Sequence, residues 1–148
     1  MKNIIVTALF LLLSTNAFAC YDGSLSNRAN FDNCLTEAEQ GVAAAQNLTG
    51  TAYEYGLGVA QDYKEAVKWY TKAAEQGHAD AQHDLGNMYY DGTGVAQDYK
   101  SAHMWYNIAA ANGNSNAVKN RDLLAKEMTP SQIEKAQDMA REWMAKHQ

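Results

Sequence analysis

Apolar residues recur at helical spacing along most of this chain. The clearest stripe lies between Asp62 and Gly77. It consists of Ala66, Trp69, Tyr70, Ala73 and Ala74. Residues three and four apart share one face of an α-helix, so this stripe predicts a helix with a broad buried side. Another helix is predicted over residues 43–55, and no stretch has the two-residue alternation of a half-buried strand. The chain is therefore predicted to be all-α.

Turn and cap signals separate these two helices. Gly56 and Gly58 interrupt the first helix, and Asp62 is a favourable N-cap for the second. Glu65 stands three residues after Asp62, a spacing that predicts a capping box. Gly77 follows the second helix at the position where glycine commonly ends helices. The unit as a whole is predicted to be two helices joined by a short turn.

The same unit occurs twice. Residues 43–78 and 79–114 are identical at 19 of 36 aligned positions, and residues 59–64 recur unchanged as 95–100. A period of this length is typical of stacked helical pairs, in which each unit buries its apolar face against the next. The sequence therefore predicts an α-solenoid of helix-turn-helix repeats with a 36-residue period, forming one domain over residues 20–148.

The segment before the first full repeat is predicted to be an N-terminal cap. Residues 27–40 stand where a second helix belongs, with Cys34 in the place of Tyr70 and Gly41 in the place of Gly77. This stretch is polar, as the end of a solenoid should be. Residues 20–42 are thus predicted to form a cap that contains half a repeat.

The segment after the second repeat, residues 115–148, is predicted to be a partial repeat followed by a capping helix. Residues 117–127 resemble another first helix. Thr129, Pro130 and Gln132 then supply the N-cap, the first-turn proline and the N3 residue of a final helix. The apolar face of that helix is predicted to consist of Ile133, Ala136, Ala140, Trp143 and Met144.

The first 19 residues have the features of a secretory signal peptide. Lys2 precedes an apolar stretch over residues 4–13, and Ala17 and Ala19 supply the small residues that a signal peptidase requires. No later stretch is apolar enough to span a bilayer. The chain is predicted to be periplasmic or secreted, with Cys20 as the first residue of the mature protein.

Cysteine and charge content bear on the state of Cys20 and on the class of partner. Cys20 and Cys34 are the only cysteines, and an oxidising compartment favours a disulfide between them. The alternative is a lipid anchor on Cys20, which would leave Cys34 unpaired. The chain has 12 Lys+Arg and 17 Asp+Glu, so removing Lys2 with the leader gives 11 − 17 = −6. This acidic balance argues against nucleic acid and anionic membranes as partners.

The repeats resemble the Sel-one-like repeat family, which is related to the tetratricopeptide repeats. The pattern A-x-x-x-L-G-x-x-Y-x-x-G-x-G-V-x-x-D-x-x-x-A-x-x-W-Y-x-x-A-A-x-x-G matches residues 81–113 throughout and residues 45–77 with one departure, Thr49 in the place of Leu85. The resemblance implies a right-handed superhelix whose first helices line a concave face, and it implies an adaptor that binds other proteins. Exported bacterial members are associated with host interaction, envelope assembly and immunity against toxins delivered by rival cells.

The resemblance also implies which residues would contact a partner. The outward positions of the two first helices are Asn47, Thr51, Glu54, Tyr55, His83, Asn87, Tyr90 and Asp91. None of these positions is identical between the repeats, whereas most expected core positions are. Tyr55 and Tyr90 are the strongest candidates, because neither has an aromatic counterpart and exposed tyrosines are common interface anchors. The repeated tryptophans and tyrosines are expected in the core.

Motifs of catalysis are absent from the sequence. It contains no Ser-x-x-Lys, no phosphate-binding Gly-x-x-x-x-Gly-Lys and no His-Glu-x-x-His. His78, His83, His103 and His147 share no metal-ligand spacing and are expected on the surface. No catalytic residue, metal or cofactor is predicted.

The leading hypothesis is an exported protein-interaction module. An immunity protein against a delivered toxin is an alternative within that class. A thiol-dependent β-lactamase-like enzyme and an envelope lipoprotein acylated at Cys20 are alternatives from other classes. The sequence does not identify the partner.

Overall fold

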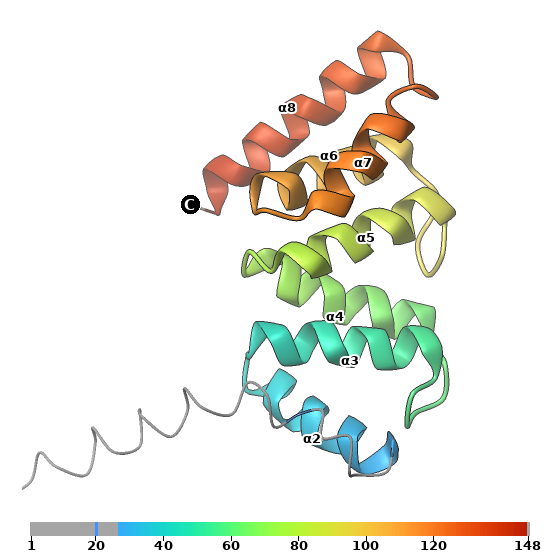
Figure 1. Ribbon diagram of the computed structural model, residues 1–148, viewed down its shortest axis with the longest axis vertical. Coiled ribbons are helices and arrows are strands. Elements are labelled where there is room, and N and C mark those ends of the chain that lie inside the picture. The colour runs from blue at the N-terminus through green and yellow to red at the C-terminus, as the bar shows by residue number, and fades with distance from the viewer. Residues whose placement is uncertain (1–19, 21–26, 148) are drawn as a thin grey trace, which may run out of the picture.

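The computed structural model describes residue 20 and residues 27–147 as a stack of helices. In chain order these are α2 (Asn27–Glu39), α3 (Ala43–Tyr55), α4 (Tyr63–Glu75), α5 (Ala79–Asp91), α6 (Tyr99–Ala111), α7 (Ser115–Leu124) and α8 (Pro130–Lys146). They succeed one another along the long axis of the molecule, with α2 near one end and α8 at the other (Figure 1). The predicted all-α solenoid is confirmed. The predicted signal peptide, residues 1–19, lies outside the described residues.

The second helix of each repeat begins at the predicted aspartate. The Asp62 carboxylate accepts hydrogen bonds from the backbone N–H groups of Lys64 and Glu65, at 3.0 and 3.1 Å. The second half of the predicted capping box does not form. The N–H of Asp62 donates instead to the carbonyl oxygen of Tyr53 at 2.9 Å, and Glu65 pairs with Lys68. The turn folds back onto the first helix and satisfies this N–H there.

The turn between the helices requires glycine because it touches the preceding unit. Gly58 and Gly94 have φ values of 75° and 72°. A Cβ at Gly94 would lie 2.4 Å from the carbonyl oxygen of Tyr63, and one at Gly58 would lie 2.0 Å from that of Asn27. Each turn therefore packs directly on the start of the second helix of the unit before it, and this close approach contributes to the spacing of the stack.

The repeated apolar residues form the core. Trp69, Tyr70, Trp105 and Tyr106 are buried, as predicted. The alanines of the second helices, at positions 66, 73, 74, 102 and 109, are fully enclosed, which lets neighbouring helices approach closely. The tyrosines of the first helices, at positions 53 and 89, are only half-buried. Most of the positions that face another helix are thus identical between the repeats.

A buried glutamine links each first helix to the unit before it. Gln82 donates from Nε2 to the carbonyl oxygen of Ala74 at 3.0 Å, and its Oε1 accepts from Asn112 at 2.8 Å. Gln46 repeats the arrangement, donating to Ala38 and accepting from the side chain at position 76. Because a buried amide is costly unless paired, these bonds favour one register of stacking.

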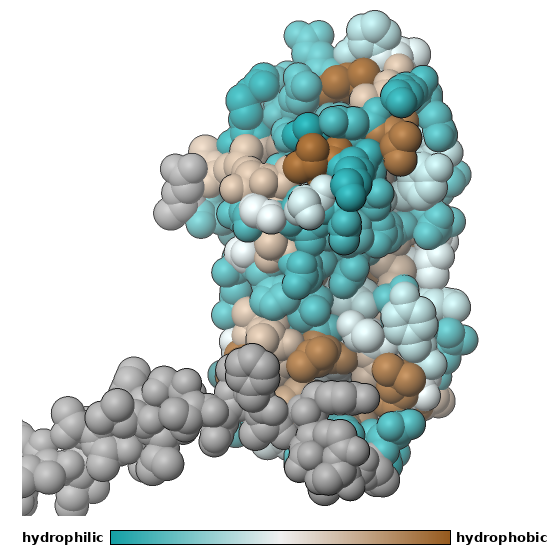
Figure 2. All heavy atoms as spheres, viewed as in Figure 1, coloured by the Kyte–Doolittle hydropathy of each residue, from teal (hydrophilic) through white to brown (hydrophobic). Residues whose placement is uncertain are grey.

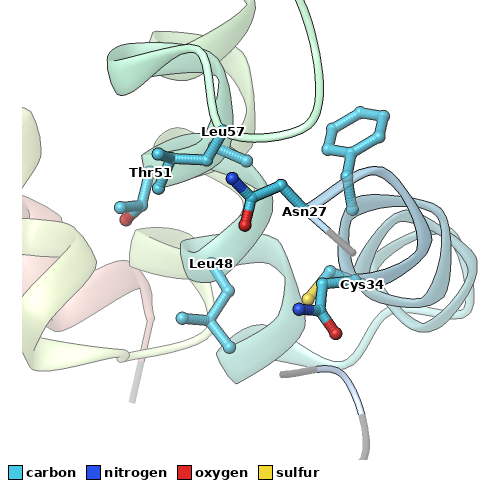
Figure 3. Close-up of a pocket in the computed structure, with 8 residues that line it drawn as sticks. Asn27, Cys34, Leu48, Thr51 and Leu57 are labelled. Carbon is cyan, nitrogen blue, oxygen red and sulfur yellow. The ribbon is translucent and has the colours of Figure 1, made fainter. Parts of the chain in front are cut away.

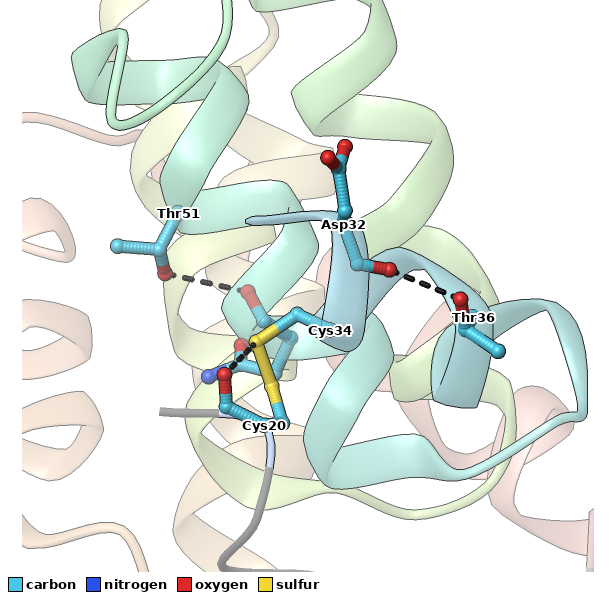
Figure 4. The surroundings of a disulfide bond; sticks show 6 residues. Cys20, Asp32, Cys34, Thr36 and Thr51 are labelled. Atoms are coloured by element: carbon cyan, nitrogen blue, oxygen red, sulfur yellow. Dashed lines mark hydrogen bonds between the residues drawn. A yellow bond between two sulfur atoms is a disulfide. The ribbon is translucent and has the colours of Figure 1, made fainter. Parts of the chain in front are cut away.

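The N-terminal end is closed by the predicted disulfide between Cys20 and Cys34 (Figure 4). Both residues are buried, and their Cα atoms are 4.5 Å apart. Cys34 lies on α2 at the position that Tyr70 has on α4. The disulfide therefore occupies the side of α2 that, in a full repeat, faces the first helix of its own pair. A sulfur in a disulfide cannot also carry a lipid thioether.

The C-terminal end is closed by α8, which packs against α6. Thr129 and Gln132 form the predicted capping box, and Ala136 and Ala140 are fully buried. The Trp143 ring meets Trp105 edge-on at 5.4 Å between centroids. The helix before it, α7, ends at Leu124, three residues earlier than predicted.

One surface prediction is wrong. His103 is only 2% exposed, and two charged residues of α7, Arg121 and Asp122, act on its pKa. Val67 has the same position in the first repeat, so an apolar residue would be the ordinary occupant. Within the part of the chain that the structure describes, no helix is both long and apolar enough to cross a membrane.

Candidate partner-binding face

The eight predicted contact residues lie on two neighbouring first helices, α3 and α5, and none of them is fully buried. We call this set the divergent strip. It consists of Asn47, Thr51, Glu54, Tyr55, His83, Asn87, Tyr90 and Asp91. Figure 2 shows that hydrophilic residues dominate the face in view, with hydrophobic patches toward its two ends.

Tyr70 of α4 holds two side chains of the divergent strip on α3 by hydrogen bonds. Its hydroxyl donates to Glu54 Oε2 at 2.5 Å and lies 3.2 Å from Thr51 Oγ1. The ring reaches this position because residue 50 is glycine: a Cβ there would lie 2.7 Å from the Tyr70 ring carbons. A core residue of α4 thus fixes two side chains of the outer face of α3.

Tyr106 of α6 likewise holds a side chain of the divergent strip on α5. Its hydroxyl donates to Asn87 Oδ1 at 2.9 Å, and its ring lies against Gly86. Asn120 of α7 also donates to Asn87 Oδ1, at 3.3 Å, and its Nδ2 lies 3.0 Å from His83 Nε2. The strip is therefore joined to α7, a connection that the prediction from sequence did not include.

Tyr70, Tyr106 and Asn120 are the residues of this face that sequence reasoning missed. The two tyrosines were assigned to the core alone. The sequence did contain a signal that these hydroxyls form hydrogen bonds. Both repeats have tyrosine rather than phenylalanine here, and a buried tyrosine hydroxyl usually needs a partner. Asn120 had no such signal, since α7 belongs to a partial repeat with little identity to the others.

The two tyrosines of the strip differ in their surroundings. Tyr55 is 63% exposed. Tyr90 is half-buried and stacks on Tyr99, with ring centroids 5.4 Å apart and planes 14° from parallel. Tyr55 is therefore a freely accessible aromatic side chain, whereas Tyr90 presents one face of a ring that the protein already supports.

Carboxylates surround these phenols and raise their pKa values. Glu54 is the largest cause of the raised pKa of Tyr55, and Glu127 is the largest cause for Tyr90. Burial is the main reason that the pKa values of Tyr70 and Tyr106 are raised much further. All four hydroxyls therefore stay protonated at neutral pH and act as hydrogen-bond donors.

A hollow of about 260 Å³ lies between α2 and α3, which we call the N-terminal hollow. Leu48 and Thr51 of α3 and Asn27 and Cys34 of α2 contribute to it (Figure 3). Phe31, Ala52 and Leu57 add apolar surface. It is the more apolar of the two hollows that adjoin the strip.

A second hollow of about 280 Å³, the C-terminal hollow, lies between α5, α6 and α7. It is lined by Asn87, Tyr90, Asp91, Tyr106, Asn120, Leu123, Leu124 and Glu127. Three members of the divergent strip line this hollow, and one lines the N-terminal hollow. The face is equipped for hydrogen bonding and aromatic contact. Among residue 20 and residues 27–147, no group of three or more His, Cys, Asp or Glu side chains is arranged to hold a metal ion.

Paired helices stacked with a fixed register, carrying varied side chains on a braced outer face, define this chain as an α-solenoid repeat protein. The Sel1 repeat profile matches residues 43–78 and 79–114. The chain is a member of the Sel1 repeat family, whose members are generally protein–protein interaction modules.

Two solved structures share the fold. The first is c5321, a protective antigen of uropathogenic Escherichia coli with an SLR fold; it is 35% identical with a TM-score of 0.79, and the match covers 81% of this chain and 26% of that one. The second is a Sel1 repeat protein from Oxalobacter formigenes, 41% identical with a TM-score of 0.64, covering 66% of this chain and 40% of that one. This chain thus spans less than half the length of either. The comparison with curated proteins finds no match.

Proposed function

We propose that this protein is an exported adaptor that binds a partner protein through the divergent strip, on the concave face of the solenoid. The observation that carries the proposal is the contrast between the strip and its supports. Tyr70 and Tyr106 are identical in the two repeats and hold the strip in place, whereas each pair of equivalent strip positions differs. A constant scaffold under a variable surface suits recognition of one specific partner.

The accessible chemistry of the strip supports the same function. Tyr55 projects a large aromatic side chain into solvent, and Tyr90 offers a supported ring next to a hollow. Rigid aromatic side chains bury much apolar area at a small entropic cost, so they commonly dominate binding energy. The strip combines such anchors with the polar groups of Glu54, His83 and Asn87.

Export is supported by the disulfide between Cys20 and Cys34. Disulfides persist in the periplasm and outside the cell and are rare in the reducing cytosol. The solved neighbour c5321 is a protective antigen, which is a property of that protein. By analogy we propose a periplasmic or secreted location for this chain.

The test is affinity capture with the tagged chain from envelope and secreted fractions, read by mass spectrometry. A second bait carries Tyr55→Ala with Tyr90→Ala. A matched control carries Lys64→Ala with Lys100→Ala, equivalent exposed positions in the first turns of α4 and α6, away from the strip. Circular dichroism and thermal unfolding check that all baits are folded.

We expect one protein to be captured stoichiometrically by the native and control baits and lost with the tyrosine variant. If the captured protein is a toxin whose activity the chain suppresses, the function is immunity. Equal capture by all three baits would contradict the assignment of the strip. Turnover of a substrate by the purified chain would contradict the adaptor function itself.

A further inference from the structure

Two carboxylates of the C-terminal hollow lie at the ends of helices, where negative charge is unfavourable. Asp91 is the last residue of α5, and Glu127 follows the end of α7 by three residues, its N–H bonding the carbonyl oxygen of Leu124. The carbonyl groups at a helix C-terminus carry partial negative charge, so cations rather than anions are stabilising there. The hollow thus combines two carboxylates with two negative helix ends.

Within residue 20 and residues 27–147, no cationic side chain, whether lysine, arginine or histidine, is paired with these two carboxylates. None of these residue types lines the hollow either. The raised pKa of Tyr90 reflects the same surplus of negative charge, since Glu127 and Asp91 both contribute to it. The described part of the chain therefore leaves both carboxylates of this hollow without a cationic partner.

The remaining walls of the hollow suit a long cationic side chain. Tyr90 supplies aromatic surface, and Leu123, which is 58% exposed, supplies apolar surface at the rim. The Asn87 and Asn120 amides are held in place by the bonds described above. Aromatic faces beside carboxylates favour a guanidinium group, which stacks on rings while donating hydrogen bonds in its plane.

We infer that the C-terminal hollow is the seat for an arginine side chain of the partner protein, with Asp91 and Glu127 as its counter-charges. The inference rests on the proposed function, because it assigns part of the partner's chemistry to one end of the divergent strip. The guanidinium lies between the two carboxylates, and its aliphatic stem passes over Leu123. The partner segment that reaches this hollow is basic.

The experiment measures binding of a synthetic probe to the whole chain at low salt. The probe is a fluorescein-labelled glycine–serine peptide with three arginines, and its uncharged counterpart has citrulline at each arginine. Asp91→Asn with Glu127→Gln removes the proposed counter-charges. The matched control, Glu134→Gln with Glu142→Gln, removes two exposed carboxylates from α8 and gives the same net charge.

We expect the arginine peptide to bind the native chain at least about 10-fold more tightly than the citrulline peptide, as expected for a paired, ring-stacked guanidinium. Affinity for the arginine peptide should fall about 10-fold in the variant with Asp91→Asn and Glu127→Gln. In the control variant it should fall less than about 2-fold. In nuclear magnetic resonance spectra, the arginine peptide should shift the Asn120 side-chain amide. The free Asp91 and Glu127 variant should also have a higher Tm than the control, because repulsion at two helix ends is removed.

Several results would overturn the inference. One is equal binding of the arginine and citrulline peptides. Another is an equal loss in both charge variants, which would mean attraction by net charge alone. A third is a hollow filled by a second copy of this chain, seen as a dimer by sedimentation. The proposed function is tested separately. Partner capture that survives Tyr55→Ala with Tyr90→Ala would contradict binding through the divergent strip, regardless of how the arginine peptide binds.

Discussion

The hydroxyl of Tyr70, a core residue of α4, donates a hydrogen bond of 2.5 Å to the carboxylate of Glu54 on the outer face of α3. One side chain thus belongs to both the core and the candidate binding surface. Packing of the Tyr70 ring against Gly50 positions its hydroxyl, and the hydrogen bond from that hydroxyl holds the Glu54 carboxylate in place. This part of the candidate binding face is consequently held in place in the free protein, which would reduce the entropic cost of binding a partner there.

Tyr70→Phe should therefore lower stability without changing the packing of the ring. The substitution leaves Glu54 and Thr51 without the hydroxyl, and loss of a hydrogen bond to a charged group typically costs about 1.5–3 kcal/mol. Urea unfolding followed by circular dichroism measures the change. Tyr63→Phe is the control, because Tyr63 is exposed and should change stability by less than about 0.5 kcal/mol. Equal effects of the two substitutions would contradict the bracing role.

Two threonines of α3 should respond in opposite directions to the same substitution. Thr49 is fully buried, and its Oγ1 has no hydrogen-bond partner among the described residues. Thr49→Val keeps the shape and removes this unpaired hydroxyl, so it should stabilise the chain by about 1 kcal/mol. Thr51→Val should destabilise it by a similar amount, because Thr51 Oγ1 lies within hydrogen-bonding distance of Tyr70 and of the Asn47 carbonyl oxygen. Urea unfolding of both variants tests the difference in sign.

Reduction of the disulfide should loosen the N-terminal cap. Cys20 and Cys34 are 14 residues apart, and closing a loop of this length contributes about 3 kcal/mol on the chain-entropy model. Unfolding with and without reductant should show this loss for the native chain. The double variant Cys20→Ser with Cys34→Ser should match the reduced protein and be insensitive to reductant. An unchanged midpoint on reduction would contradict a stabilising role for the bond.

The stability of the chain should fall in mild acid because of His103. Burial, followed by the positive charge of Arg121, lowers the pKa of this imidazole from 6.5, and Asp122 opposes the shift. A lowered pKa in the folded state means that folding favours the neutral ring. This contribution is present in full above pH 6.5 and is lost as the pH falls through the lower pKa of the folded protein.

His103→Leu removes this titration and places a leucine where the first repeat has Val67. The Tm of the native chain should therefore fall more steeply than that of the variant below pH 6.5. Above that pH the two Tm curves should run parallel. Parallel curves over the whole range would show that the buried imidazole does not govern acid stability.

The sequence predicted the helices because their signals are local and occur twice. Asp62 and Asp98 begin α4 and α6, and the interhelical glycines end α3 and α5. Two copies of the unit also helped to separate core from surface within the helices, because the buried apolar residues of the second helices repeat while the eight positions of the divergent strip differ. The same comparison failed for His103, where a polar side chain occupies a position that the stack covers.

The amino-acid sequence by itself determined the repeat, the limits of the helices in the two full repeats, and the choice of the eight positions of the divergent strip. Only the tertiary structure decided how those positions are held and where the face continues. The hydrogen bond from Asn120 to Asn87 joins residues 33 positions apart, and Asp91 and Glu127, 36 positions apart, line one hollow. Their geometry depends on the distance and register at which whole helices stack. The turn glycines, the buried glutamines and the core side chains set these together.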